Sequence, residues 1–304
     1  MAKKIYIMVV SEIPGFNDRD LRVRMPELNI ISEIEPVLIA KNPPAEITPA
    51  VWLKLAREIY QRADSAIGFV VMHGVDNLLF SACALSYLLP NFPRPVIFTG
   101  GQTGNVEVNN METRANLVNS IQTANFPVAG VGLMFGNRLL RACQAIRSLD
   151  EPVNVFTAPL NGILGRIDFS IRLFDKISPP AKGRSRLYQK LNINLAVKDA
   201  SPLLLADGLS EADKAKDGLI VNAGRYRQLP PPALDLIAAA GNLPVLVWSR
   251  KISSAALAPK NMILANHLTW ESAVTKFMWA RAQTDKIKEL KELMAEDVAG
   301  EFLE

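Results

Sequence analysis

The chain has 304 residues, 49% of them hydrophobic and 21% charged, which is ordinary for a globular protein and excludes a disordered or fibrous one. Its 34 basic residues nearly balance its 30 acidic ones, so the net charge of +4 and the pI near 9.0 do not indicate nucleic acid as a partner. No apolar run is long enough to span a bilayer, and we expect no membrane partner. The length suits two domains, each large enough to bury a core.

The expected location is the cytoplasm. The first residues, "MAKKIYIMVVSEIPG", hold too short an apolar run for a secretion signal and instead predict the first strand of a sheet. The two cysteines, Cys83 and Cys143, lie in apolar segments without a CxxC spacing, as expected of reduced residues in a core.

Short apolar runs alternate with amphipathic stretches along the chain. The strand-like runs comprise residues 4–10, 66–72, 95–100, 128–135, 192–197, 219–222 and 244–249. Residues 48–63 predict a helix, with Thr48 as N-cap, Pro49 in the first helical position and apolar side chains at the i, i+3, i+4, i+7 spacing. Residues 109–124 predict a second helix in the same way. This alternation predicts an α/β fold with a mostly parallel sheet and helices on both faces.

The alternation breaks at residues 178–190, "SPPAKGRSRLYQK", which are Pro-rich and then basic. We predict a larger N-terminal domain of residues 1–180, a linker of residues 181–191 and a smaller C-terminal α/β domain of residues 192–304. The basic side chains of the break could bind an anion, but a solvated loop between domains explains them more simply.

Ligands of an open α/β sheet bind beyond the carboxyl ends of its strands. In this sequence those positions are residues 11–15, 73–77, 99–105 and 136–147. The second of them reads "HGVDN", and its valine stands where the mouth of a site would be expected to carry a hydroxyl group.

Several motifs, in the same order, resemble the bacterial and archaeal L-asparaginase family. Residues 68–89, "GFVVMHGVDNLLFSACALSYLL", are similar to the family's "GxVVTHGTDTxxETAxxLS", and residues 94–102, "RPVIFTGGQ", to "KPVVLTGAM". Residues 130–148, "GVGLMFGNRLLRACQAIRS", are similar to "GVxVVFGDxLLRGNRATKV", and residues 155–167, "VFTAPLNGILGRI", to "AFxSPNxPPLGxI". Residues 262–302 resemble the family's last motif, so the resemblance covers nearly the whole chain.

The resemblance implies an asparaginase-like fold, with a larger N-terminal sheet domain, flanking helices and a smaller C-terminal α/β domain. It implies hydrolysis of L-asparagine to L-aspartate and ammonia, without a metal ion or organic cofactor. In this family a threonine hydroxyl on an N-terminal loop attacks the amide, and a second threonine acts with an aspartate and a lysine in proton transfer. The resemblance also implies homodimers, often paired into homotetramers, whose sites are completed by a neighbouring subunit.

The position of the nucleophile has lost its hydroxyl group. The family's "TGGTI" aligns with the end of the first strand so that Ile13 stands at the nucleophilic threonine. An isoleucine side chain cannot attack a carbonyl carbon. Ser11 is the nearest hydroxyl in the sequence, so a displaced nucleophile stays open as an alternative, provided that a base lies within hydrogen-bonding reach.

The proton-transfer residues are also changed. Val75 stands at the second threonine and has nearly its shape without its oxygen, so the fold tolerates the exchange while proton transfer does not. Asp76 is retained and, by the resemblance, would hold the substrate's amino group. Arg147 stands at the lysine, where it can pair with Asp76 but is effectively never deprotonated, and Ile146 replaces the hydroxyl before it. His73 is interpreted as structural.

The substrate-holding positions differ as well. Pro44 and Ala45 stand where the family binds the α-carboxylate of the substrate, and neither offers a polar side chain. Thr99 and Gln102, at or just after the end of the run 95–100, are further candidates for substrate contact. Thr99 and Thr103 flank "GGQ", where backbone N–H groups could form an oxyanion cradle.

The C-terminal domain departs from the family at a glycine-rich turn. The family's "EGFGAGNVP" aligns with "NAGRYRQLP", so Arg225, Tyr226 and Arg227 replace glycine and small residues. An exposed loop or a subunit contact explains this patch most simply. A new site for an anion or a protein partner is the alternative.

Three hypotheses follow from these departures. The first is a degenerate family member, a pseudoenzyme retained for binding a small amide or anion or for assembly. The second is an active amidohydrolase with a displaced hydroxyl nucleophile, in which Ser11, Thr99 or Thr103 acts with Asp76 and Arg147. The third, a component of an amidotransferase-like complex, fits less well, because relatives of that kind carry an extra N-terminal domain that we do not expect here.

Overall fold

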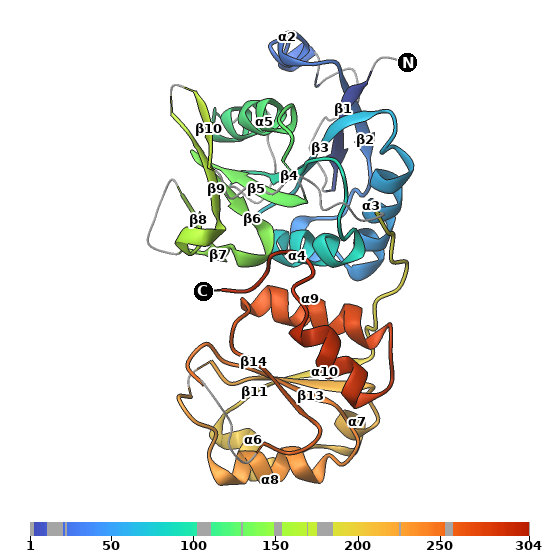
Figure 1. Cartoon of the computed structure of the whole chain (residues 1–304), viewed down its shortest axis with the longest axis vertical. Coiled ribbons are helices and arrows are strands. Elements are labelled where there is room, and N and C mark those ends of the chain that lie inside the picture. The colour runs from blue at the N-terminus through green and yellow to red at the C-terminus, as the bar shows by residue number, and fades with distance from the viewer. Residues whose placement is uncertain are drawn as a thin grey trace. The chain divides into compact units, whose positions relative to one another are not determined.

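In the computed structural model, strands and helices alternate along much of the chain (Figure 1). The described residues are 3–10, 21, 23–101, 111–128, 130–148, 154–168, 170–174, 185–224, 226–252 and 258–303. The chain divides into two compact units, one of residues 1–189 together with 298–304 and one of residues 190–297. The division into domains of residues 1–180 and 192–304 stays a prediction.

The first unit contains an eight-stranded sheet in the order β10-β9-β6-β5-β4-β3-β1-β2. Its strands are β1 (Lys4–Val9), β2 (Ile34–Leu38), β3 (Ala66–Met72), β4 (Val96–Thr99), β5 (Val131–Phe135), β6 (Arg138–Arg141), β9 (Ile163–Ile167) and β10 (Ile171–Leu173). The pairs from β5 through β2 are parallel, whereas β6, β9 and β10 are joined in antiparallel pairs. The predicted α/β architecture with a mostly parallel sheet is therefore confirmed.

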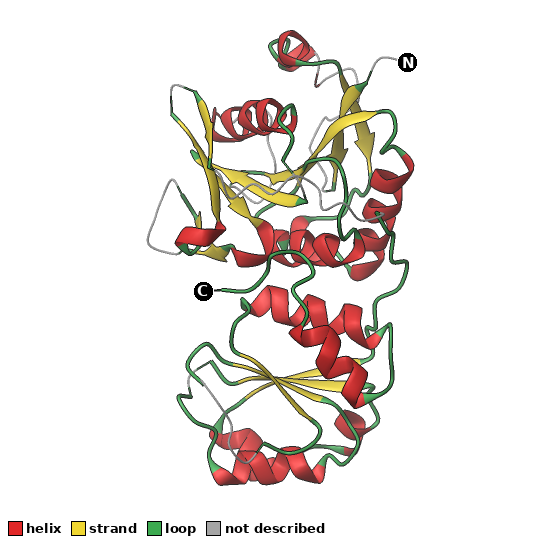
Figure 2. Ribbon diagram, in the orientation of Figure 1, coloured by secondary structure: helices red, strands yellow, loops and turns green. Residues whose placement is uncertain are grey.

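Helices cover both faces of this sheet (Figure 2). The helices of the unit are α2 (Leu28–Ile31), α3 (Pro49–Gln61), α4 (Leu78–Leu88) and α5 (Met111–Ala124), with single 3-10 turns η1 (Pro44–Glu46), η2 (Ala142–Gln144) and η3 (Leu160–Gly162). A short antiparallel pair, β7 (Ile146–Arg147) and β8 (Phe156–Thr157), lies between η2 and η3 in the chain. In α3 the predicted apolar stripe is buried, and Thr48 occupies the N-cap position with Pro49 following it, although its side chain makes no capping bond.

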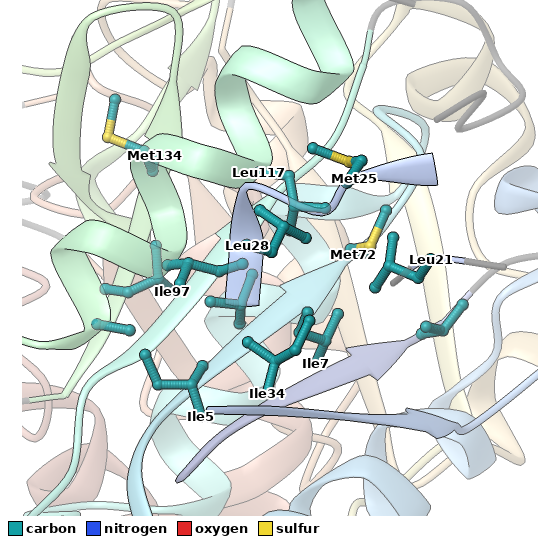
Figure 3. Packing of buried hydrophobic residues seen from close by; sticks show 14 of the residues in the cluster. Ile5, Ile7, Leu21, Met25, Leu28, Ile34, Met72, Ile97, Leu117 and Met134 are labelled. Atoms are coloured by element: carbon teal, nitrogen blue, oxygen red, sulfur yellow. The ribbon is translucent and has the colours of Figure 1, made fainter. Parts of the chain in front are cut away.

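The core between α5 and the sheet joins most of these elements (Figure 3). Ile7 and Met72 from β1 and β3 contact the same cluster as Leu117 from α5, and all three are almost completely buried. Burial of a leucine or methionine side chain stabilises a fold by about 1.5–3 kcal/mol relative to exposure. The core therefore fixes the relative places of β1, β3 and β4, whose ends carry the candidate site.

The second unit is a four-stranded parallel sheet in the order β11-β12-β13-β14. Its strands are β11 (Leu195–Asp199), β12 (Gly218–Asn222), β13 (Val245–Trp248) and β14 (Met262–Ala265), and its helices are α6 (Pro202–Asp207), α7 (Glu211–Lys214), α8 (Pro231–Ala239), α9 (Trp270–Arg281) and α10 (Ile287–Ala295). The strand predicted at residues 192–197 begins only at Leu195. The reason is a local turn, in which the Asn192 side-chain oxygen accepts a hydrogen bond from the Asn194 N–H at 2.9 Å.

A buried lysine joins the last two helices of the second unit. Lys276 of α9 is completely buried, and its ammonium group donates to the carbonyls of Met294 and Glu296, at 3.1 and 2.5 Å, where α10 ends. A cation at this place satisfies carbonyl groups that have no partner within the helix and interacts favourably with the helix dipole. Within the described part of the chain, no helix is long and apolar enough to cross a membrane.

Candidate functional site

The candidate site begins where three parallel strands end side by side. β1, β3 and β4 are neighbours in the sheet. The Val10 N–H donates to the Met72 carbonyl at 3.0 Å, and the His73 N–H donates to the Thr99 carbonyl at 2.9 Å. Residues 10, 73 and 100 are therefore held at one edge of the sheet, which is the edge where an α/β sheet binds its ligands.

A buried hydrogen-bond network holds the first residues of the "HGVDN" segment. His73 is completely buried, and its Nδ1 lies 2.6 Å from the Gly74 carbonyl, which can only accept, so Nδ1 carries the proton. The other ring nitrogen, Nε2, then accepts from the Ser81 hydroxyl at 2.8 Å. Ser81 in turn accepts a hydrogen bond from Trp52 Nε1 at 2.7 Å. Burial lowers the pKa of His73 to about 4, so the ring is neutral near pH 7.

Every side-chain polar atom of His73, Ser81 and Trp52 has a hydrogen-bond partner. Neither His73 nor Ser81 is exposed to solvent. A hydroxyl donating to a histidine resembles a nucleophile with its base, but a substrate cannot reach it here. We interpret the His73–Ser81–Trp52 network as a support that fixes the start of the loop carrying Val75 and Asp76.

Val75 and Asp76 follow directly after that support. Val75 is 6% exposed, so its hydrocarbon is buried. The Asp76 carboxylate is half exposed and lies 3.5 Å from the Arg147 guanidinium, which is also half exposed. A pair this accessible to water contributes little to stability, about 0–1 kcal/mol. The pair therefore leaves both charges available to a polar ligand.

The residue after Asp76 connects the loop to η1. Asn77 has a left-handed backbone with φ of 57°, precedes α4 at its N-cap position, and donates from its side-chain amide to the Ala45 carbonyl at 3.1 Å. The structure thus brings the chain at Pro44 and Ala45 next to the loop that carries Asp76. The side chain of Ala45 is exposed and offers no hydrogen-bonding group.

Thr99 does not present its hydroxyl group to the sheet edge. It is 1% exposed, and its Oγ1 donates to the Met134 carbonyl of the neighbouring strand at 3.0 Å. The next residue, Gly100, lies so close to the His73 carbonyl that a Cβ there would approach it to 2.0 Å. The loop at β4 therefore needs glycine to fit against β3.

Asn116 of α5 is a site residue that the sequence did not indicate. Its side-chain amide donates to the Gly100 carbonyl at 2.8 Å, and its side-chain oxygen accepts from the Gly136 N–H at 2.9 Å. It is 1% exposed and so joins the ends of β4 and β5 from inside the fold. A polar residue in the buried stripe of a helix was the signal that could have identified it.

Several predicted site residues lie outside the described residues. These are Ser11, Ile13, Gln102, Thr103 and Arg225. Their roles stay predictions, as do those assigned to Val75, Asp76 and Arg147.

Two residues of the C-terminal patch are described. The Tyr226 carbonyl accepts from the Ser249 hydroxyl at 3.1 Å, and the Tyr226 side chain packs against the core of the second unit. Arg227 is exposed. Among the residues with described positions, no group of three or more His, Cys, Asp or Glu side chains could hold a metal ion.

Comparison with known proteins identifies the family. The family model described as "Asparaginase, N-terminal" matches residues 9–178, more than half of the chain. The chain belongs to the asparaginase family. The resemblance that we found in the sequence is therefore confirmed, including the segments that contain Val75, Asp76 and Arg147.

The relatives of the chain include amidotransferase subunits and L-asparaginases. The chain is 26% identical to a glutamyl-tRNA(Gln) amidotransferase subunit from Methanosphaera stadtmanae, over 95% of this chain and 71% of that protein. It is 33% identical to L-asparaginase 1 of Escherichia coli K12 over 45% of this chain, and that match spans 39% of the relative. The L-asparaginase I structure from Vibrio cholerae is similar with a TM-score of 0.84 and 23% identity, covering 99% of both chains, and supports the fold.

Proposed function

We propose that this asparaginase-family protein does not hydrolyse L-asparagine at a useful rate and is retained for binding or assembly. The observation that carries the proposal is Val75. Its buried side chain lies directly before Asp76, where the family resemblance implies a catalytic hydroxyl group. A valine has no proton to pass on, and no side-chain rotation changes that.

The charged partner of Asp76 supports the same proposal. Arg147 contacts the Asp76 carboxylate, but a guanidinium does not act as a proton acceptor in proteins, whereas a lysine amine can. Removing one member of a hydroxyl-based catalytic unit costs on the order of a thousandfold or more in rate. By the resemblance Ile13 stands at the nucleophile as well, so both of the family's catalytic hydroxyl groups would be absent at their usual positions.

The open Asp76–Arg147 pair suggests what could still bind. A carboxylate and a guanidinium side by side can hold a small amide or a small anionic ligand through charge-assisted hydrogen bonds. The absence of polar side chains at Pro44 and Ala45 argues against a free amino acid, whose α-carboxylate would need donors there. Cys83 and Cys143 are both buried and form no disulfide bond, which is consistent with a reducing compartment and so with the cytoplasm.

Ammonia release tests the proposal directly. Purified protein would be incubated with asparagine, glutamine and simple amides, beside Asp76→Ala and the double variant Val75→Thr with Arg147→Lys. We expect no ammonia above the buffer background from any of them, because the double variant still has Ile13 at the nucleophile. Ammonia release by the unchanged protein that Asp76→Ala abolishes would instead establish an active amidohydrolase. Ser11→Ala and Thr103→Ala would then identify its displaced nucleophile.

A ligand titration tests the proposal that the site no longer binds a free amino acid. We expect aspartate and asparagine to leave the melting temperature unchanged, because a ligand raises it only by binding the folded state. A clear increase with either amino acid would contradict the disabled carboxylate site.

The similarity to proteins named as components of a glutamyl-tRNA(Gln) amidotransferase favours assembly as a second candidate function. By family resemblance we propose a homodimer or homotetramer. Light scattering coupled to gel filtration measures the mass in solution, and a monomer at micromolar concentration would contradict it.

A further inference from the structure

One edge strand of the second unit has a free side. β11 begins the strand order β11-β12-β13-β14, so among the described strands it has a neighbour on one side only. It comprises Leu195–Asp199, and all five of its residues pair with β12 without a register shift. An edge strand of this kind presents a row of N–H and C=O groups with which another chain can pair.

Alternate residues of β11 direct their backbone groups away from β12. The Asp217 N–H donates to the Asn194 carbonyl at 2.9 Å, and the Ala200 N–H donates to the Asn222 carbonyl at 2.8 Å. Because the direction of the backbone groups alternates along a strand, the even-numbered residues of β11 pair with β12. The odd-numbered residues, which point outward, are Leu195, Val197 and Asp199. Their N–H and C=O groups bond to none of the residues that the structure describes.

The side chains at this edge are apolar where they are exposed. Val197 is 54% exposed, more than any other large apolar side chain in the described strands, and Ile193, just before the strand, is 70% exposed. On the opposite face of β11, Ala196 packs in the core of the second unit, and the Lys198 ammonium lies 2.9 Å from the Asp213 carboxylate. Lys198 therefore does not protect the edge as an unpaired lysine would.

The other edges of the two large sheets carry features that prevent pairing. β2 has Pro36 in the middle of the strand, and a proline has no N–H to offer a further strand. β10, at the opposite edge of the same sheet, is only three residues long. β14, the second edge of the smaller sheet, is almost completely buried. Among the sheet edges that the structure describes, β11 is thus the regular, exposed and apolar one.

We propose that β11 pairs antiparallel with β11 of a second copy of this chain, about a two-fold axis at Val197. In this register the two strands overlap along their whole length, and the two small sheets join into one. Val197 exchanges hydrogen bonds with Val197 of the second copy, and Leu195 exchanges them with Asp199, so every outward backbone group of the strand finds a partner. The pairing rests on the assembly proposed above and names a surface for it.

The sequence of β11 is complementary to itself in this register. The exposed Val197 side chain meets an identical apolar side chain at the axis. Lys198 lies opposite Ala196 of the second copy, and Asp199 lies opposite Leu195, so like charges do not face each other. An axis at Lys198 or at Asp199 would set two identical charges directly opposite, which destabilises a strand pair. A two-fold contact also covers the exposed edges of both copies at once, as in most homodimers.

Disulfide cross-linking of the full chain tests the pairing and its register. The two Cα atoms of residue 197 would lie about 5.5 Å apart, within the range that a disulfide spans. We therefore expect Val197→Cys to give a cross-linked dimer in oxidised glutathione. Asp199→Cys is the matched control, because it is exposed in the same strand but its two copies would lie about 14 Å apart. Cys83 and Cys143 are buried, and the unchanged protein measures their background.

The mass in solution shows whether this contact holds copies together. Val197→Pro removes an outward N–H and leaves the bonds between β11 and β12 in place, so we expect the mass measured by light scattering to halve. Val197→Lys sets two like charges at the axis and should weaken association about tenfold, which keeps the test decisive if the proline variant unfolds. The control Leu38→Lys, at an exposed position of edge strand β2, should keep the mass of the unchanged protein.

The possible failures separate this interface from the assembly itself. A monomer at micromolar concentration would overturn both. An oligomer that Val197→Cys does not cross-link and whose mass Val197→Pro does not change would leave the assembly standing and overturn the β11 interface. Equal cross-linking by Asp199→Cys would contradict the axis at Val197. Protection of the Val197 amide from hydrogen exchange only after an unrelated extended peptide is added would assign the edge to another partner and overturn the second copy.

Discussion

Ser81→Ala tests whether the His73–Ser81–Trp52 network supports the site loop. The Ser81 hydroxyl donates to His73 Nε2 at 2.8 Å and accepts from Trp52 Nε1 at 2.7 Å, and none of the three polar atoms can reach water easily. Replacing the hydroxyl by hydrogen leaves a buried donor on Trp52 and a buried acceptor on His73. Each such unsatisfied group costs about 1–3 kcal/mol, so we expect the first unit to lose about 3 kcal/mol of stability.

The same helix offers a matched control. Ser86 is 5% exposed, close to the complete burial of Ser81, and its hydroxyl donates to the Ala82 carbonyl at 2.9 Å, four residues earlier in α4. Removing that hydroxyl leaves a carbonyl that the helix ladder already uses. Ser86→Ala should therefore cost about 1 kcal/mol or less.

Native-state hydrogen exchange is the assay of choice, because a chain of two units need not unfold in one step. Amides in β3 that exchange only through opening of the first unit report its stability alone. A loss for Ser81→Ala within about 0.5 kcal/mol of that for Ser86→Ala would refute the reasoning, since it would show that His73 and Trp52 find other partners.

Two further predictions concern other buried groups. Burial lowers the pKa of His73 to about 4 in the folded protein, against about 6.5 in the unfolded chain. Between these pH values only the unfolded chain binds the proton, so unfolding becomes easier as the pH falls. The stability that depends on a neutral His73, on the order of 3 kcal/mol, is therefore complete above about pH 6.5 and lost as the pH falls toward 4. His73→Gln should flatten that part of the pH dependence measured by exchange in β3, and an unchanged profile would contradict the assignment. Lys276→Met leaves the carbonyls at the end of α10 without their cation, and should destabilise the second unit by about 2 kcal/mol in β12 amides while β3 amides stay unchanged. Equal effects on both units would be inconsistent with this local role.

Helices and strands with a regular spacing of hydrophobic residues were predicted from the sequence, and those without such a spacing were missed. The helix at residues 48–63 was visible because one face is apolar and the other polar. α4 has no such contrast, since nearly all of it is buried, and it was not predicted. β6, β9 and β10 were not predicted, because each contains arginine, as in "RLLR" and "IRL", and so lacks the continuous apolar run that marked strands of similar length such as β4 and β13.

Residues of the candidate site could be predicted only at motif positions where the role depends on the side chain of that one residue. Val75, Asp76 and Arg147 were recognised because each stands at a position whose chemistry the resemblance defines. Their grouping depends on long-range contacts, since 71 residues separate the two members of the ion pair. Asn116 was missed for the same reason, because its partners come from two loops that are distant in the chain.

The arrangement of the "HGVDN" segment explains how catalysis can be lost while the fold is kept. The position of the loop depends on backbone pairing to β4 and on a side-chain network that contains neither Val75 nor Arg147. Exchanging threonine for valine at the mouth removes an oxygen but changes neither of these supports. The hydroxyl group that catalysis would need and the hydrogen bonds that hold the loop in place therefore involve different atoms. A lineage that no longer needed asparagine hydrolysis could lose the first without weakening the second, as the proposed function of this chain requires.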